Sequence, residues 1–215
     1  SFPTRRSSDL IAINPAASVL HYANEVFEGM KAYRWSDGSI HLFRPMENAK
    51  RINISAERIG LPQIPNEIFI EAVREVVKVD KNWVPSGEGT SLYIRPFLYA
   101  IDPELALHGI HQATFVIILS PSASYFAEGI KPVKIMLETE DVRAVRGGTG
   151  YTKCGGNYAA SNRAGDRAME KGYSQVLWLD GVHRKYIEEV GAMNVMFKIN
   201  GTVVTPSLEN GSILG

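Results

Sequence analysis

One lysine stands in a glycine-dense stretch of this 215-residue chain. Lys153 lies within the segment GGTGYTKCGGN at residues 147–157. Glycine lets a backbone approach a ligand closely, and a desolvated lysine amine is a nucleophile. The segment therefore predicts a site with a reactive amine in place of regular structure, although residue types alone do not specify the reaction.

Two phosphate-binding motifs can be tested against this segment, and neither fits. A Walker loop needs Gly-Lys followed by Ser or Thr, whereas Thr152 precedes Lys153 and Cys154 follows it. A dinucleotide-binding fingerprint would need a third glycine where Lys153 stands. His108 and His111 are three residues apart but have no carboxylate cluster near them, so we expect loop histidines and no metal site.

The elements around the segment indicate an α+β fold, because stretches with period two alternate with stretches of helical period. The expected helices run from Pro45 to a stop at Gly60, from Asn66 as N-cap to a stop at Trp83, and from Tyr158 to Lys171. The expected strands cover residues 39–43, 91–98, 113–119, 132–137 and 175–179, and a hairpin joins 195–199 to 202–205 through Asn200-Gly201.

These elements fall into two predicted domains. We expect a polar N-terminal extension at residues 1–10, a small α+β domain at 11–120, an interdomain loop at 121–131 and a larger, incomplete domain at 132–215. The chain ends at Gly215 directly after a turn and with no closing element, which predicts a truncated chain.

Composition and charge exclude several classes of partner. Lys and Arg number 23, as do Asp and Glu, so the formal net charge is zero and no global field attracts nucleic acid or an anionic membrane. No apolar run approaches the ~20 residues that cross a bilayer. The single cysteine, Cys154, permits no intrachain disulfide and no zinc spacing, which favours the reducing cytoplasm.

Several ordered motifs carry a resemblance to one family. They are KCGGNYAAS at residues 153–161, QVLWLDG at 175–181, EEVGAMN at 188–194, LHY at 20–22, VFEGMKAY at 26–33, LFRP at 42–45 and SLYIRP at 91–96. Together they resemble the branched-chain amino-acid aminotransferases of the fold-type-IV pyridoxal-phosphate enzymes. The resemblance implies a two-domain fold, with a small α/β sandwich domain and a larger α/β barrel-like domain that is incomplete here.

The resemblance assigns the cofactor pyridoxal 5′-phosphate and four residues that hold it. Lys153 matches the Schiff-base lysine, whose freed amine would move a proton between the substrate α-carbon and the cofactor C4′. Glu189, rather than its neighbour Glu188, matches the carboxylate that pairs with the pyridine nitrogen. Tyr158 matches the phenol that hydrogen-bonds the cofactor 3′ oxygen, and Arg51 matches the phosphate-binding arginine.

The resemblance also implies a substrate pocket. Tyr22, Phe27 and Tyr93 occupy positions of the apolar pocket that selects branched side chains. Arg95 matches the residue that meets the distal carboxylate of glutamate. Ala192 stands where several relatives carry Thr, so a hydroxyl near the substrate carboxylate is missing.

The implied function is transamination of leucine, isoleucine or valine with 2-oxoglutarate, in a homodimer whose other partners are amino acids and 2-oxo acids. A D-amino-acid aminotransferase or an aminodeoxychorismate lyase of the same fold is an alternative. A third alternative is an inactive cofactor-binding fragment, because the family string Ile-Leu-Pro-Gly lacks its proline before Gly215 and the phosphate site is expected to be incomplete. The sequence does not rank the three substrates or separate synthesis from degradation.

Overall fold

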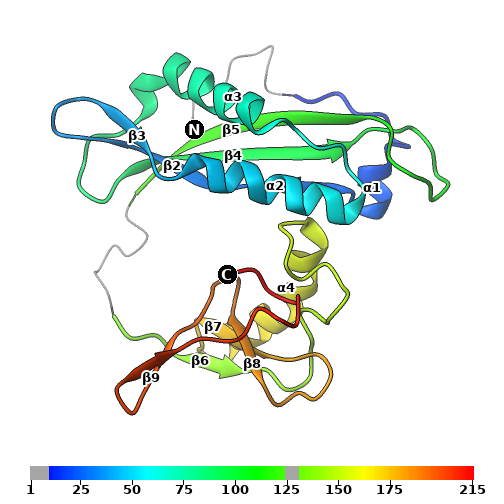
Figure 1. Cartoon of the computed structure of the whole chain (residues 1–215), viewed down its shortest axis with the longest axis vertical. Coiled ribbons are helices and arrows are strands. Elements are labelled where there is room, and N and C mark those ends of the chain that lie inside the picture. Colours follow the sequence, from blue (N-terminus) through cyan, green and yellow to red (C-terminus); the bar gives the residue numbers. More distant parts are fainter. Residues whose placement is uncertain (1–9, 124–130) are drawn as a thin grey trace.

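The computed structural model describes residues 10–123 and 131–215, which form a five-stranded sheet, a three-stranded sheet and a two-stranded hairpin, together with helices (Figure 1). The helices are α1 (Ser18–Tyr22), α2 (Pro45–Ile59), α3 (Asn66–Val79) and α4 (Gly155–Glu170), with a 3-10 turn η1 (Lys81–Trp83). The strands are β1 (Glu25–Phe27), β2 (Met30–Arg34), β3 (Ile40–Leu42), β4 (Ser91–Ala100), β5 (Ala113–Ser122), β6 (Ile135–Leu137), β7 (Gln175–Leu179), β8 (Ile187–Val190), β9 (Phe197–Ile199) and β10 (Thr202–Val204). The predicted α+β class is therefore confirmed. Every helix in the described ranges is too short or too polar to cross a bilayer.

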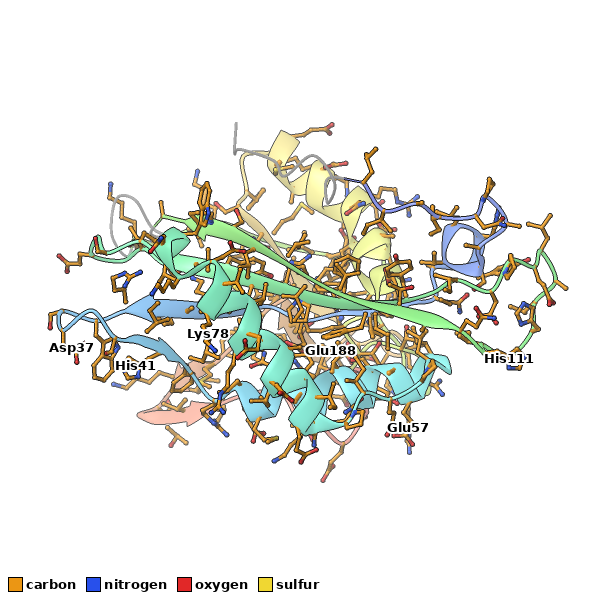
Figure 2. The ribbon with its side chains drawn as sticks, turned by 90° about the horizontal axis from the view of Figure 1, so that it is seen from above. Asp37, His41, Glu57, Lys78, His111 and Glu188 are labelled. Carbon is orange, nitrogen blue, oxygen red and sulfur yellow. The ribbon has the colours of Figure 1, made fainter. Side chains whose placement is uncertain are left out.

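The first sheet is antiparallel and is built around β4. Strand β5 pairs along one edge of β4, while β1 and β2 follow one another along the other edge and β3 pairs with β2. Helices α2 and α3 lie across one face of this sheet (Figures 1 and 2). The second half of the chain contacts this layer through α2 and the edge strand β1, since Lys153 bonds Ser55 of α2 and Phe27 of β1.

The first core forms between these two helices and the sheet. Ile52 of α2, Phe69 and Val73 of α3, and Leu92 and Ile94 of β4 are all fully buried in it. Their helical and alternating spacings were the basis of the predicted elements. Each such side chain contributes about 1.5–3 kcal/mol when it leaves water, which fixes α2 firmly on the sheet.

The ends of the two helices differ in how well the sequence predicted them. Helix α2 begins at Pro45 and ends before Gly60, which takes a positive φ of 78°, as predicted. The prediction that Asn66 caps α3 is wrong, because Pro65 is the N-cap and no side chain caps that end. The Asn66 amide oxygen instead accepts a hydrogen bond from the side-chain amide of Asn53 on α2, at 3.1 Å.

The second sheet joins β6, β7 and β8. Strands β6 and β7 are parallel and α4 is the crossover between them, while β8 runs antiparallel to β7. Trp178 of β7 is buried against Ala164 and Ala168 of α4. The predicted hairpin is confirmed, because Asn200 and Gly201 have the two positive φ values, 49° and 84°, that a type I′ turn needs.

Helix α4 begins earlier than predicted. It starts at Gly155, three residues before the expected Tyr158, so part of the glycine-dense segment is regular after all. The physical reason is that a side chain from the first sheet satisfies its first backbone donor: the Gly155 N–H donates to the Glu25 carboxylate at 3.1 Å. A partner 130 residues away cannot be read from local spacing.

The predicted boundary between domains overlaps a strand. β5 extends to Ser122, where Pro121 pairs with Leu92 and Ser122 with Ser91. The first two residues of the loop expected at 121–131 therefore belong to the sheet. Residues 124–130 of that loop and residues 1–9 of the expected extension lie outside the described residues.

Candidate active site

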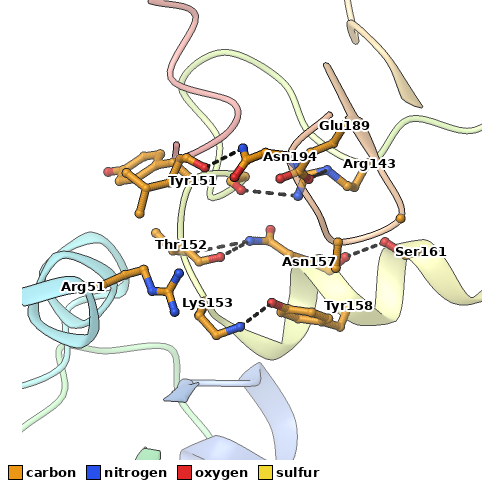
Figure 3. A pocket seen from close by; sticks show the side chains of 14 residues that line it. Arg51, Arg143, Tyr151, Thr152, Lys153, Asn157, Tyr158, Ser161, Glu189 and Asn194 are labelled. Atoms are coloured by element: carbon orange, nitrogen blue, oxygen red, sulfur yellow. Dashed lines mark hydrogen bonds and ion pairs between the residues drawn. The ribbon is translucent and has the colours of Figure 1, made fainter. Parts of the chain in front are cut away.

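A pocket lies between α2, the bend at residues 150–153, α4 and β8, and five of the nine predicted site residues line it (Figure 3). Its lining includes Lys153 from the bend before α4, Tyr158 from α4, Glu189 from β8 and Arg51 from α2. Ala192 also lines it. The chain therefore brings an amine, a phenol, a carboxylate and a guanidinium to one cavity from four different elements.

The Lys153 amine is held at a defined position. Its Nζ donates a hydrogen bond to the Tyr158 phenol oxygen at 3.0 Å. The same nitrogen lies 4.6 Å from the ring centroid of Phe27, which comes from β1 of the first sheet. An amine between two aromatic rings loses part of its water shell, which is the condition under which lysine becomes a nucleophile.

The bend that carries Lys153 is tied to α4 by Asn157, which the sequence reasoning did not single out. The buried Asn157 amide nitrogen donates to the backbone oxygens of Thr149 and Thr152 at 2.7 and 2.8 Å. Its amide oxygen accepts from the Thr149 hydroxyl at 2.8 Å. Asn157 thus closes the turn before the lysine. Its place shortly after Lys153 was visible in the sequence, but its role depends on the bend.

The Glu189 carboxylate is buried beside a cation that the sequence did not reveal. Arg143 lies in the loop before the bend, and its Nε is 3.0 Å from Glu189 Oε2. Burial raises the Glu189 pKa, and the neighbouring Glu188 acts in the same direction, while Arg143 and Lys153 oppose the rise. Arg143 also donates to the backbone oxygen of Ser212 at 2.8 Å. No sequence signal distinguished Arg143, because Glu189 and Ser212 lie far along the chain.

The two adjacent glutamates point to opposite sides of β8, as successive strand residues must. Glu188 Oε1 accepts a hydrogen bond from the Ser212 hydroxyl at 2.5 Å and does not line the pocket. Of the pair, only Glu189 lines the pocket with Lys153, and its pairing with a cofactor nitrogen stays a prediction of the resemblance.

Arg51 reaches the pocket with its charge already partly balanced. Its Nε and Nη2 donate to the two oxygens of the fully buried Glu28 at 2.6 and 2.8 Å. This bond to Glu28 is the main reason that the Arg51 pKa is raised, so the guanidinium stays charged. The pair orients Arg51 and leaves its Nη1 donors for an anion.

The expected substrate residues are only partly brought together. The Phe27 and Tyr158 rings lie 4.9 Å apart, and the Arg95 guanidinium carbon lies 4.6 Å from the Phe27 ring centroid. Arg95 Nη2 donates to the Tyr93 phenol at 2.7 Å. None of Phe27, Tyr93 and Arg95 lines the pocket, and neither does Tyr22 of α1, whose phenol donates to the backbone oxygen of Leu105.

The described part of the chain contains no group of three or more His, Cys, Asp or Glu residues that could hold a metal ion. The His108 and His111 rings stack with centroids 5.9 Å apart, in the loop between β4 and β5. Four of the side chains that line the pocket offer distinct chemistry. An amine can bond a carbonyl carbon, a guanidinium can hold an anion, and a buried carboxylate can stabilise a protonated nitrogen.

Comparison with known protein families gives a match over most of the chain. The family model described as amino-transferase class IV matches residues 25–215. Among curated proteins, branched-chain-amino-acid aminotransferase 2 of Bacillus subtilis (strain 168) is 56% identical over 204 residues, which are 95% of this chain and 56% of that protein. The chain thus spans about half the length of the curated relatives that it matches.

Solved structures give the same result for the fold. A branched-chain aminotransferase from the archaeon Thermoproteus uzoniensis, crystallised with norvaline, superposes with a TM-score of 0.82 at 27% identity, covering 97% of this chain and 67% of that one. A second branched-chain amino acid aminotransferase, solved with pyridoxamine 5′-phosphate, has a TM-score of 0.75 at 25% identity and covers 91% of this chain and 63% of that one.

Proposed function

The chain belongs to the class IV aminotransferases, and from this premise we propose that the protein is a branched-chain amino-acid aminotransferase. It would move the amino group of leucine, isoleucine or valine to 2-oxoglutarate, giving branched-chain 2-oxo acids and L-glutamate. The names of the curated relatives support this substrate class. The observation that carries the proposal is the Lys153 amine, held 3.0 Å from the Tyr158 phenol in a pocket that also includes Glu189.

Pyridoxal 5′-phosphate is the cofactor whose chemistry fits this set of side chains. Lys153 would bond its aldehyde carbon, and Arg51 would hold its phosphate through the donors that Glu28 leaves unused. Glu189 would accept a hydrogen bond from the pyridine nitrogen, and Tyr158 would donate one to the ring oxygen. When bound, the cofactor would supply a ring that takes up the electron pair left behind as the substrate α-proton departs.

Each protein side chain would then do a separate task. Once the substrate amino group has displaced it from the cofactor, the freed Lys153 amine would carry the proton from the substrate α-carbon to the cofactor C4′. Tyr158, already hydrogen-bonded to that amine, would keep it on the correct side of the pocket. Arg143 would counter the burial that raises the Glu189 pKa, so that Glu189 can stay ionised opposite a protonated nitrogen.

Substrate selection would rest on Phe27, whose ring centroid lies 4.6 Å from the Lys153 amine, and on Tyr93, whose phenol accepts a hydrogen bond from Arg95. The rings of Phe27 and Tyr93 would form an apolar surface that binds a branched aliphatic side chain in preference to a polar one. Arg95 would receive the distal carboxylate of glutamate or 2-oxoglutarate, since its Nε is buried and has no hydrogen-bond partner in the described ranges. Ala192 would leave room beside the substrate carboxylate, and Tyr22 stays a predicted substrate contact.

The cofactor proposal is tested by the spectrum of the purified protein mixed with pyridoxal phosphate. We expect a visible absorbance band that is lost in Lys153→Ala, with a fall in amino transfer of at least about a hundredfold. Lys171→Ala is the matched control, because Lys171 is exposed at the other end of α4 and should leave the band intact. Borohydride should fix the cofactor on the peptide that contains Lys153. A band that persists in Lys153→Ala would refute the assignment.

The substrate proposal is tested separately by comparing amino donors and by native mass. L-Leucine with 2-oxoglutarate should react, whereas D-alanine and aminodeoxychorismate should not. Turnover of either of the latter in place of leucine would favour another enzyme of the same fold, and cofactor binding with no turnover at all would favour a binding fragment. We also propose a homodimer, which native mass spectrometry of the protein would detect as twice the chain mass.

A further inference from the structure

The backbone of Lys153 is bound from both sides by the first sheet and its helix. The Lys153 N–H donates to the Ser55 hydroxyl oxygen of α2 at 3.0 Å. The Lys153 carbonyl accepts from the Phe27 N–H of β1 at 3.0 Å. An isolated bridge between Val26 and Cys154 continues the contact. The segment that carries the amine therefore lies along β1 almost like an additional strand.

Ser55 is well placed to hold the lysine. It is fully buried on α2 and follows Arg51 by four residues, so both side chains project from the same face of the helix. A buried backbone N–H without a partner is costly, and the Lys153 N–H is donated to Ser55. One helix face thus presents the guanidinium to the pocket and fixes the backbone beneath the amine.

Glu25 performs a second holding role, at the N-terminus of α4. The N-cap residue Cys154 makes no side-chain capping bond. The Gly155 N–H instead donates to Glu25 Oε2 at 3.1 Å, and a Cβ at Gly155 would overlap the Glu25 carboxylate. A carboxylate that caps a helix normally comes from the residue just before it. Here it comes from a strand of the other sheet, which ties the helix bearing Tyr158 to the strand bearing Phe27.

We propose that Ser55 and Glu25 are positioning residues for the reactive amine, holding the Lys153 bend and the start of α4 against the first sheet. Neither side chain lines the pocket. Their effect on the reaction would pass through the placement of the Lys153 amine between Phe27 and Tyr158. The effect on the reaction rests on the proposed function. The hydrogen bonds that Ser55 and Glu25 accept from the backbone of Lys153 and Gly155 do not depend on it.

The hold on the backbone is tested by amide hydrogen exchange of the protein without cofactor, followed by NMR. In Ser55→Ala the Lys153 amide should exchange about fivefold faster or more, since one hydrogen bond is lost. Ser91→Ala is the matched control. Ser91 is a buried serine of β4 in the first sheet, and its hydroxyl has no hydrogen-bond partner in the described ranges. Equal exchange of the Lys153 amide in the two variants would overturn the role of Ser55.

Glu25 is tested with a pair of substitutions that separates its hydrogen bond from its bulk. In Glu25→Ala the Gly155 amide should exchange about fivefold faster, while Glu25→Gln keeps an oxygen acceptor and should restore protection. Faster exchange of the Gly155 amide in Glu25→Gln as well as in Glu25→Ala would exclude the capping bond.

The link to the reaction is tested in the cofactor-loaded protein. Ser55→Ala and Glu25→Ala should each lower kcat for L-leucine about tenfold and leave KM within about twofold of wild type. Both variants should also shift the pH midpoint of the visible band. Glu25→Gln and Ser91→Ala should stay near wild type in all three measurements. Unchanged kcat and midpoint in both alanine variants would refute the positioning role. If the wild-type protein shows no band, the proposed function fails, and the exchange rates still decide whether Ser55 and Glu25 hold the bend.

Discussion

At the scale of single residues, the contact between Arg143 and Glu189 opposes the burial that raises the Glu189 pKa. Both side chains are largely buried, with 7% and 11% of their surfaces exposed. Such a pair is weak evidence of net stabilisation, because both charges lose water. Removing one partner alone should destabilise the protein, because the other charge is left buried without a counter-charge.

Arg143→Gln should therefore destabilise the protein by about 3 kcal/mol, measured by urea denaturation at neutral pH. The same change should raise the Glu189 pKa further, since Arg143 now opposes the rise caused by burial. Arg163→Gln is a suitable control, because Arg163 is 79% exposed in its ion pair with Asp141 and should have little effect. Equal losses in the two variants would show that the Glu189 charge is not stabilised by Arg143.

The residues of the pocket differ in how visible they were in the sequence. Lys153 could be found because its glycine neighbours are adjacent in the chain. The cofactor residues Arg51, Tyr158 and Glu189 were assigned only through the family resemblance. Arg143 carried no signal at all, because what makes it important is its contact with β8 and with the C-terminal turn, and such contacts exist only after folding.

At the scale of elements, Gly150 shows one reason why the bend before Lys153 is rich in glycine. A Cβ at Gly150 would overlap the Ser212 backbone oxygen and the Ala144 side chain. The bend passes so close to two other loops that no side chain fits. Close packing therefore requires glycine at position 150, whereas Gly147 has open space around it and a positive φ of 78°.

Gly150→Ala should consequently destabilise the protein by about 2 kcal/mol, because the clash involves backbone that cannot easily move. Gly165→Ala offers the opposite case in the neighbouring helix α4, since a Cβ added there would meet nothing within 4 Å and alanine favours helix. We expect that substitution to stabilise the protein by about 0.5–1 kcal/mol. Thermal unfolding followed by circular dichroism would measure both, and a stabilised Gly150→Ala protein would contradict the close packing.

Local patterns predicted elements well where the stabilising contacts are local. Strand β7 has the predicted bounds, and α2 starts and stops at the predicted Pro45 and Gly60. The start of α4 was misplaced because the residue that satisfies it, Glu25, belongs to another sheet. The cap of α3 was misassigned because Asn66 bonds to α2 rather than to its own helix.

At the scale of the whole molecule, polar contacts around the pocket join the two halves of the chain. Arg58 of α2 donates to the backbone oxygens of Gly147 and Gly148, and Glu25 accepts from Gly155. Burial raises the Glu25 pKa, and the hydrogen bond from Gly155 only partly opposes this. Ionisation of Glu25 is therefore harder in the folded protein than in the unfolded chain.

This raised pKa predicts how global stability depends on pH. The stability that neutral Glu25 contributes is fully present below its unfolded pKa and is lost as pH rises through the higher folded value. Glu25→Gln cannot ionise, so its unfolding free energy should exceed that of wild type increasingly as pH rises from about 4 to about 8. Urea denaturation across this range would measure the difference. A constant difference at all pH values would mean that Glu25 ionisation is not linked to folding.

The long-range hydrogen bonds that hold Lys153 against α2 and the first sheet have a consequence for folding during synthesis. Ser55, whose hydroxyl accepts from the Lys153 N–H, is 98 residues upstream of Lys153. Glu25 is 130 residues before Gly155. Contacts of such high sequence separation form late, because long loops must close first. Ser55 and Glu25 leave the ribosome before Lys153, so in a nascent polypeptide the reactive amine would become ordered only when these long-range contacts form.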